Sequence, residues 1–174
     1  MPGAAKDLKN QEKTSLPDGS GFRIGIIVAE WNSEITEALY QGAFSALREC
    51  GVPEKEILRL SVPGSFELIT GARWMVENEK VHAVVCLGCL IRGETPHFDF
   101  IGNAVSNGLV MLAVRYSLPF IFGVLTTNTF SQATARAGGK LGNKGSEAAL
   151  TAVKMAGLKN QLGGGTQIGF STTA

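Results

Sequence analysis

The apolar run from Val84 to Ile91 constrains the fold of this chain more than any other segment. It consists of aliphatic residues, two cysteines and one glycine, and it carries no charged side chain that would require water. Such a strand is typical of a parallel sheet with both faces covered, whereas a strand with one wet face alternates apolar and polar residues. The run therefore predicts an α/β architecture in which helices cover both faces of a central sheet.

Strand and helix patterns alternate along the rest of the chain. Apolar segments predict strands at 22–29, 57–62 and 120–125 in addition to 84–91. Spacing and capping residues predict helices at 34–50, at 65–78 with Ser65 as N-cap, at 98–116, from a Thr126–Thr129 cap to 137, and at 146–158. Strands joined through helices form right-handed crossovers, so we expect one four-stranded parallel sheet.

The length of the chain and its terminal segments indicate a single domain. A chain of 174 residues can form one core of useful size, and two domains would be cramped. Residues 1–21 are expected to form a flexible arm, and residues 161–174, with the run Gly163–Gly165, a flexible tail. This tail also has the composition of an added linker and peptide. The folded domain is therefore predicted to span residues 22–160.

Charge, hydropathy and cysteine content exclude several classes of function. The net charge is +1, and no Lys/Arg cluster is interleaved with aromatics, so nucleic acid is not an expected partner. No apolar run approaches the roughly 18 residues that span a membrane, and the first residues are polar, so we expect a soluble, unsecreted protein. Three cysteines favour the reducing cytoplasm. Cys86 and Cys89 should point to opposite faces of their strand, which argues against a shared metal or disulfide.

The segment from Arg92 to Asp99 is the best candidate for a catalytic turn. It places His97 after the buried strand, in the first turn of a helix that Thr95 and Pro96 are predicted to open. Ligands of parallel α/β sheets bind outside the carboxyl ends of the strands, and a helix N-terminus there attracts anions. The helix dipole disfavours the charged imidazole, which favours His97 as a base. The other histidine, His82, is expected to lie on the surface.

Two further features allow either a functional or a structural interpretation. Trp31 follows the first strand, where its ring is either a lid over a planar ligand or a hydrophobic plug. The glycine- and lysine-rich segment 138–145 is predicted to be a loop, either anion-binding or simply solvated. Its spacing does not match a Walker A motif, and no G-x-G-x-x-G follows the first strand, which disfavours a dinucleotide site.

Five ordered motifs resemble the 6,7-dimethyl-8-ribityllumazine synthase family, and the resemblance covers about Phe22 to Leu158. The motifs are Ala29-Glu30-Trp31-Asn32, Val62 to Glu67, Gly93 to Asp99, Phe122 to Thr126, and Arg136-Ala137-Gly138 with Gly142 to Gly145. The resemblance implies a flavodoxin-like three-layer α/β/α sandwich. It also implies a transferase of riboflavin biosynthesis, acting at the penultimate step. This enzyme condenses 5-amino-6-(D-ribitylamino)uracil with 3,4-dihydroxy-2-butanone 4-phosphate, releases phosphate and water, and needs no metal or organic cofactor.

The resemblance also assigns roles to individual residues. His97 would move protons, and the substrate-binding residues would be Trp31, Ser65, Glu67, Leu90, Ile91, Glu94, Thr95, Phe122, Arg136 and Lys144. Trp31 would stack on the pyrimidine in a position that is often phenylalanine in the family. Ser65 and Glu67 would bind the ribityl chain and ring, backbone at Leu90 and Ile91 the heterocycle, and backbone N–H groups at Glu94 and Thr95 the phosphate.

Phe122, Arg136 and Lys144 would come from a neighbouring subunit, with Arg136 binding phosphate through its guanidinium fork. The family forms pentamers, and the short spacing from Arg136 to Lys144 is that of members whose pentamers close into an icosahedral 60-mer capsid. The N-terminal arm could add a strand to a neighbouring sheet.

Two alternatives remain open. A flavodoxin-like module that binds a flavin without turnover would share the fold and Trp31, but it would not need His97 or Arg136. A cage-forming scaffold with a displayed C-terminal peptide would carry the catalytic residues without using them.

Overall fold

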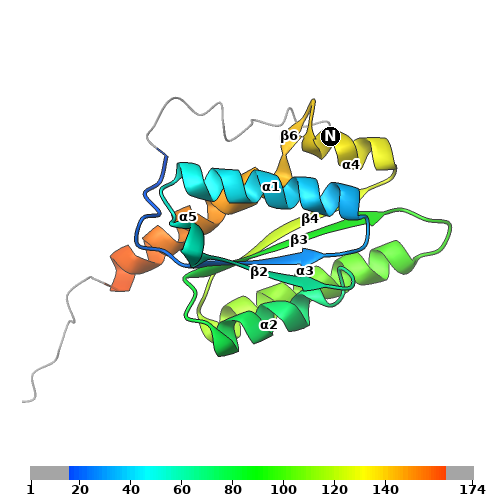
Figure 1. The fold of residues 1–174 in the computed structure, drawn as a ribbon. Helices are drawn as coiled ribbons and strands as arrows, with labels where there is room; N and C mark the ends of the chain where they lie inside the picture. Colours follow the sequence, from blue (N-terminus) through cyan, green and yellow to red (C-terminus); the bar gives the residue numbers. More distant parts are fainter. Residues whose placement is uncertain (1–15, 164–174) are drawn as a thin grey trace, which may run out of the picture.

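A four-stranded parallel sheet forms the centre of the protein, whose computed structural model describes residues 16–163 (Figure 1). The strands are β1 (Ile24–Ala29), β2 (Ile57–Val62), β3 (Ala83–Ile91) and β4 (Phe120–Thr127), in the order β2-β1-β3-β4. The helices are α1 (Ser33–Glu49), α2 (Leu68–Asn78), α3 (His97–Tyr116), α4 (Phe130–Arg136) and α5 (Lys144–Gly163), with a single 3₁₀ turn at Glu54–Glu56. A short hairpin joins β5 (Ala137–Gly139) to β6 (Gly142–Asn143).

Helices cover both faces of the sheet, as the apolar run predicted. α1 and α5 pack on one face and α2 and α3 on the other (Figure 1). Side chains alternate between the two layers, so that Ile26 lies in the α1/α5 core and Ile27 in the α2/α3 core. Both isoleucines are fully buried. The predicted flavodoxin-like three-layer architecture is therefore confirmed.

Parallel pairing brings the carboxyl ends of the strands to one edge of the sheet. β1 pairs with β2 and with β3, and β3 pairs with β4 as far as Ile91 and Thr127. The turns that follow β1, β2 and β3 therefore lie side by side at this carboxyl edge. Here the sheet presents the segments that the sequence analysis selected around Trp31, Ser65 and His97.

The last helix begins earlier and ends later than predicted. α5 starts at Lys144, because the Asn143 side chain accepts hydrogen bonds from the backbone N–H groups of Gly145 (2.8 Å) and Ser146 (3.2 Å). A β-carbon at Gly145 would lie 1.9 Å from the Leu39 carbonyl oxygen, so this glycine permits the close approach of α5 to α1. The segment 138–145, predicted to be a loop, consists instead of most of the β5–β6 hairpin and the first residues of α5.

Two predicted caps are wrong and one is confirmed. Ser65 does not cap α2, which begins at Leu68 after Glu67, and Thr95 does not cap α3, whose N-cap position is Pro96. Neither helix start has a side-chain capping bond. Thr129 does cap α4, since its hydroxyl accepts a hydrogen bond from Gln132 N–H at 3.2 Å.

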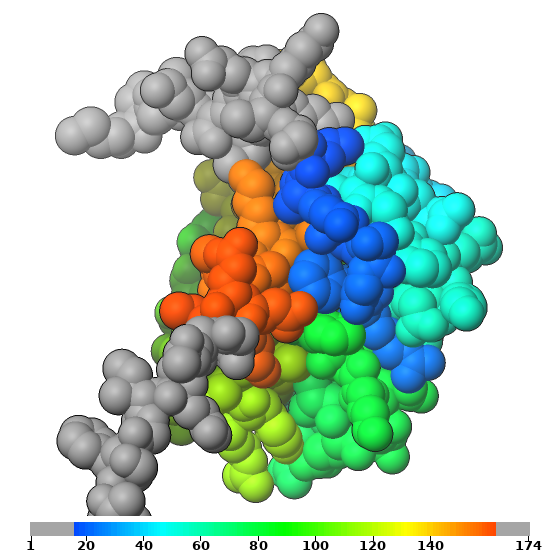
Figure 2. All heavy atoms as spheres, turned by 90° about the vertical axis from the view of Figure 1, so that its left-hand side faces the viewer, coloured from blue at the N-terminus to red at the C-terminus, as the bar shows by residue number. Residues whose placement is uncertain are grey.

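The amino edge of the sheet faces the viewer in Figure 2. The segment that leads into β1 lies there between α1 and α5. Gly19 within it is buried and donates its N–H to the Cys50 carbonyl at 2.7 Å. Residues 1–15 of the predicted arm, and 164–174 of the predicted tail, lie outside the described residues. Residues 161–163 continue α5.

Candidate active site

A cavity of about 610 Å³ opens at the carboxyl edge of the sheet. Four segments line it: the β1–α1 turn, the β2–α2 turn, the end of β3 and the start of α3. Its lining residues are Trp31, Asn32, Gly64, Ser65, Phe66, Glu67, Cys89, Leu90, Ile91, His97 and Ile101. Six of the sequence-predicted site residues, four from three separate motifs and two from the end of β3, therefore meet around one cavity.

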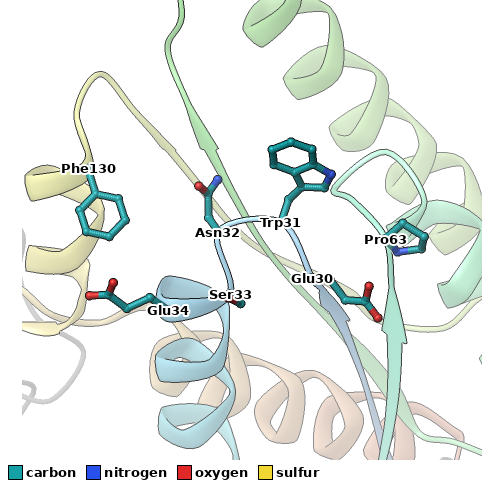
Figure 3. A pocket seen from close by; sticks show the side chains of 7 residues that line it. All are labelled: Glu30, Trp31, Asn32, Ser33, Glu34, Pro63 and Phe130. Atoms are coloured by element: carbon teal, nitrogen blue, oxygen red, sulfur yellow. The ribbon is translucent and has the colours of Figure 1, made fainter.

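Trp31 stands between this cavity and a second one. The second cavity, of about 580 Å³, is lined by Glu30, Trp31, Asn32, Ser33, Glu34, Pro63 and Phe130 (Figure 3). The indole is 73% exposed. Of the two interpretations that the sequence allowed, a buried hydrophobic plug is therefore wrong. Its backbone is fixed, because the N–H groups of Glu30 and Trp31 donate to the carbonyls of Val62 (2.8 Å) and Pro63 (3.1 Å). An exposed ring on a fixed backbone can stack on a planar ligand.

Asn32 is a site residue that the sequence analysis did not select. Its backbone is left-handed, with φ of 59°, and its Nδ2 donates to the Cys89 carbonyl oxygen at 3.0 Å. This bond ties the β1–α1 turn to the end of β3 and thus fixes two walls of the cavity. Asparagine tolerates the left-handed region better than most residues. An asparagine three residues after a buried strand was the signal available in the sequence.

Ser65 and Glu67 lie on the β2–α2 turn. Ser65 is buried, and a β-carbon at Gly88 of β3 would lie 2.7 Å from its hydroxyl oxygen, so the glycine makes room for this side chain. Glu67 occupies the N-cap position of α2 and is half-buried. A hydroxyl and a carboxylate on one short turn offer hydrogen bonds to a polyol or a heterocycle.

His97 is the first residue of α3 and is exposed at the mouth of the cavity. The structure records no hydrogen bond between its ring and any of residues 16–163. Glu94 and Thr95 lie in the exposed turn before it and do not line the cavity. The imidazole is thus available to exchange a proton with a ligand, and the adjacent backbone of the turn is open to solvent.

Phe122, Arg136 and Lys144 lie away from this cavity. Phe122 packs against the core between the sheet and the α2/α3 layer. Arg136 and Lys144 share the Glu147 carboxylate, with distances to Oε2 of 3.4 Å from Arg136 Nη2 and 3.2 Å from Lys144 Nζ. Arg136 Nη1 also donates to the Leu141 carbonyl at 3.2 Å. A single chain therefore forms the cavity without Arg136 and Lys144. Glu147, which pairs with both cations, was not selected from the sequence.

The three cysteines lie inside the protein core. All three, Cys50, Cys86 and Cys89, are free and buried. Cys86 faces the α2/α3 layer and Cys89 the α1/α5 layer, so the prediction of opposite faces is confirmed. Burial raises the pKa of both thiols, that of Cys89 to about 11, so neither is a thiolate at neutral pH.

Residues 16–163 contain neither a cluster of metal-ligating side chains nor a membrane-spanning helix. No group of three or more His, Cys, Asp or Glu side chains in this part of the chain could hold a metal ion. Within the same residues, every helix is too short or too polar to cross a membrane.

Comparison with known proteins places the chain in a family. The sequence model of the 6,7-dimethyl-8-ribityllumazine synthase family matches residues 21–160. A protein of this name from Cytophaga hutchinsonii is 53% identical over 155 residues, which cover 89% of this chain and 97% of the relative. Another from Porphyromonas gingivalis is 50% identical and covers 91% and 99%. A third from Flavobacterium johnsoniae is 50% identical and covers 90% and 82%. The chain therefore belongs to the 6,7-dimethyl-8-ribityllumazine synthase family.

Proposed function

We propose that this protein condenses 5-amino-6-(D-ribitylamino)uracil with 3,4-dihydroxy-2-butanone 4-phosphate to give 6,7-dimethyl-8-ribityllumazine, the penultimate step of riboflavin biosynthesis. The observation that carries the proposal is the cavity at the carboxyl edge, which gathers an exposed indole, a buried hydroxyl, a carboxylate and an exposed imidazole. The reaction joins an amine to a ketone, so it requires orientation and proton transfer more than a strong nucleophile from the protein.

Each group at the cavity suits one part of this chemistry. The Trp31 ring would stack on the pyrimidine, while Ser65, Glu67 and the backbone at Leu90 and Ile91 would bind the ribityl chain and the ring edge. His97 would take and return protons as the amine attacks the ketone, water leaves and phosphate is eliminated. The backbone N–H groups at Glu94 and Thr95 lie in the turn that precedes α3, where a helix N-terminus favours the phosphate.

A complete site would also contain Phe122, Arg136 and Lys144 of a neighbouring subunit in a pentamer. Two observations support this assembly. The Arg136 and Lys144 pair lies outside its own chain's cavity, at the end of α4 and the start of α5, on either side of the β5–β6 hairpin. α3 also carries exposed large apolar side chains on one face, namely Phe100, Val110, Met111 and Val114. An apolar face of this kind on a helix is typical of a surface that a second copy covers.

We further propose that the pentamers close into a 60-mer capsid in the cytoplasm. The short hairpin between Arg136 and Lys144 supports the closed shell, and three free thiols suit a reducing compartment. Size exclusion with light scattering tests the assembly. With 18.4 kDa per chain, a shell has a mass of about one megadalton, and a mass of about five chains would contradict it.

The reaction is tested by mixing the purified protein with both substrates and recording the fluorescence of the lumazine product. Formation of the lumazine together with stoichiometric phosphate is expected. Tight flavin binding without product would favour the flavin-binding module instead. A closed shell that forms no product would favour the scaffold.

A further inference from the structure

The Arg92 side chain connects three segments around the His97 turn. Its Nη1 and Nη2 donate to Asp99 Oδ2 (3.1 Å) and Oδ1 (2.9 Å) in a two-point pair across the turn. Its Nε donates to Asn128 Oδ1 at 3.3 Å, in the loop between β4 and α4. Its Cζ lies 4.4 Å from the centre of the Phe98 ring. One guanidinium thus links the end of β3, the first turn of α3 and the neighbouring loop.

The turn has few other constraints. Residues 92–97 are exposed throughout, and a β-carbon at Gly93 would meet no atom within 4 Å. α3 has no side-chain cap at its start, so the expected Thr95 bond does not hold the turn. Backbone bonds secure only its two ends: Arg92 N–H donates to Thr127 O at 2.8 Å, and Asp99 N–H donates to Pro96 O at 3.0 Å. His97 lies between Arg92 and Asp99 in the sequence, so the ion pair of these two residues spans the turn that carries it.

We propose that Arg92 is a positioning residue that sets the location of His97 through its paired contacts with Asp99, Asn128 and Phe98. The inference rests on the proposed function of His97 as the proton-transferring group. Arg92 does not line the cavity, and each of its three guanidinium nitrogens already has an acceptor in the chain. Its effect on the reaction is therefore exerted through the turn.

The shape of the guanidinium explains why arginine is required. Its planar fork matches the two carboxylate oxygens, and its flat face stacks on an aromatic ring, whereas a lysine ammonium can do neither in this way. The Arg92–Asp99 pair is about half exposed, so it contributes little to global stability. Misplacing a reacting group by about 1 Å can cost on the order of 10²-fold in rate. Loss of the Arg92 contacts should therefore slow the turnover of an enzyme that is still folded.

The test compares Arg92→Gln, Arg92→Lys, Asp99→Asn and the double variant Arg92→Gln/Asp99→Asn with wild type. The matched control is Arg73→Gln, because Arg73 also forms an exposed ion pair, with Glu77 at 2.8 Å, but lies within α2. Steady-state kinetics with both substrates give kcat and the two KM values. Amide hydrogen exchange of residues 93–98, measured without substrate, reports the turn independently of any activity.

We expect Arg92→Gln to lower kcat about tenfold or more, with less change in either KM and faster exchange at 93–98. Asp99→Asn should act similarly, the double variant should lose little more, and Arg92→Lys should only partly restore kcat. Arg73→Gln should match wild type. Unchanged amide exchange at residues 93–98 in Arg92→Gln would overturn the proposal that Arg92 positions His97. A substitution that only raised KM for the phosphorylated substrate, with kcat unchanged, would overturn it as well. Wild type that forms no lumazine would instead overturn the proposed function, and the exchange data would still decide whether Arg92 holds the turn.

Discussion

The two histidines of this protein lie at opposite ends of β3 and have opposite surroundings. His82 precedes the strand, where its Nδ1 accepts a hydrogen bond from Arg23 N–H at 2.9 Å and its ring lies 5.3 Å from that of Phe22. His97 follows the β3–α3 turn and is exposed, and its ring forms no hydrogen bond to residues 16–163. The same side chain is thus part of the fold at one edge and free for a ligand at the other.

The two edges of the sheet also differ in how the side chains near each histidine are paired. At the amino edge, Arg23 forms ion pairs of 3.0 Å with Glu56 and with Glu79, so its charge is matched by near neighbours. At the carboxyl edge, the indole of Trp31 and the imidazole of His97 are both exposed and line the cavity. Polar groups satisfied within the chain serve stability, whereas exposed groups that line a cavity are available for recognition and catalysis.

The largest effect is expected from His97→Ala. Removing the proton-transferring group should lower turnover by on the order of 10²-fold or more, with little change in folding because the ring has few internal contacts. Lumazine fluorescence measures the rate, and circular dichroism during heating measures the fold. Unchanged turnover in a folded variant would remove His97 from the mechanism and erase the functional difference between the two edges.

Arg136→Lys should affect one substrate selectively. Lysine keeps the charge but loses the two-point fork, so we expect KM for the phosphorylated butanone to rise about tenfold and KM for the pyrimidine to change much less. Initial rates at varied concentrations of each substrate separate the two constants. Equal changes in both would indicate that Arg136 supports the β5–β6 hairpin, through its bond to Leu141 O, and does not bind phosphate.

Trp31→Ala should weaken pyrimidine binding. Loss of an aromatic stack worth roughly 1 kcal/mol predicts a several-fold rise in KM for the pyrimidine and little change in KM for the butanone phosphate. Trp31→Phe is the matched control, since a phenyl ring retains most of the stack. If both variants bind the pyrimidine as wild type does, the exposed indole serves the neighbouring cavity or a subunit contact.

The strands could be predicted closely because their signal is local. β2 was predicted at the residues where it occurs, and β3 to within one residue, since a short apolar run between turn residues identifies a buried strand. Helix starts were less predictable. Ser65 looked like a cap, but its side chain is buried beside Gly88, and Asn143, which does cap α5, could equally have belonged to a loop.

The candidate site was predictable in its residue types but not in its supporting contacts. Trp31 and His97 were selected because each follows a strand, whereas the site role of Ser65 came from the family resemblance; parallel pairing then brings these strand ends together. The bonds from Asn32 to Cys89 O and from Arg92 to Asn128 join residues far apart in sequence. Such pairings are set by the register between strands, which a single sequence does not specify.

The smallest effect is expected at the other histidine. His82→Phe retains a ring against Phe22 but removes the Nδ1 acceptor, so the Arg23 N–H loses its hydrogen bond. Losing one partly buried bond of this kind costs about 1 kcal/mol of unfolding free energy, or about 2–4 °C in Tm. Turnover should match wild type, because the change lies at the amino edge. A variant of unchanged Tm would show that water replaces the imidazole acceptor. A marked fall in kcat would instead show that the two edges of β3 are coupled, and the comparison between the histidines would no longer separate fold from function.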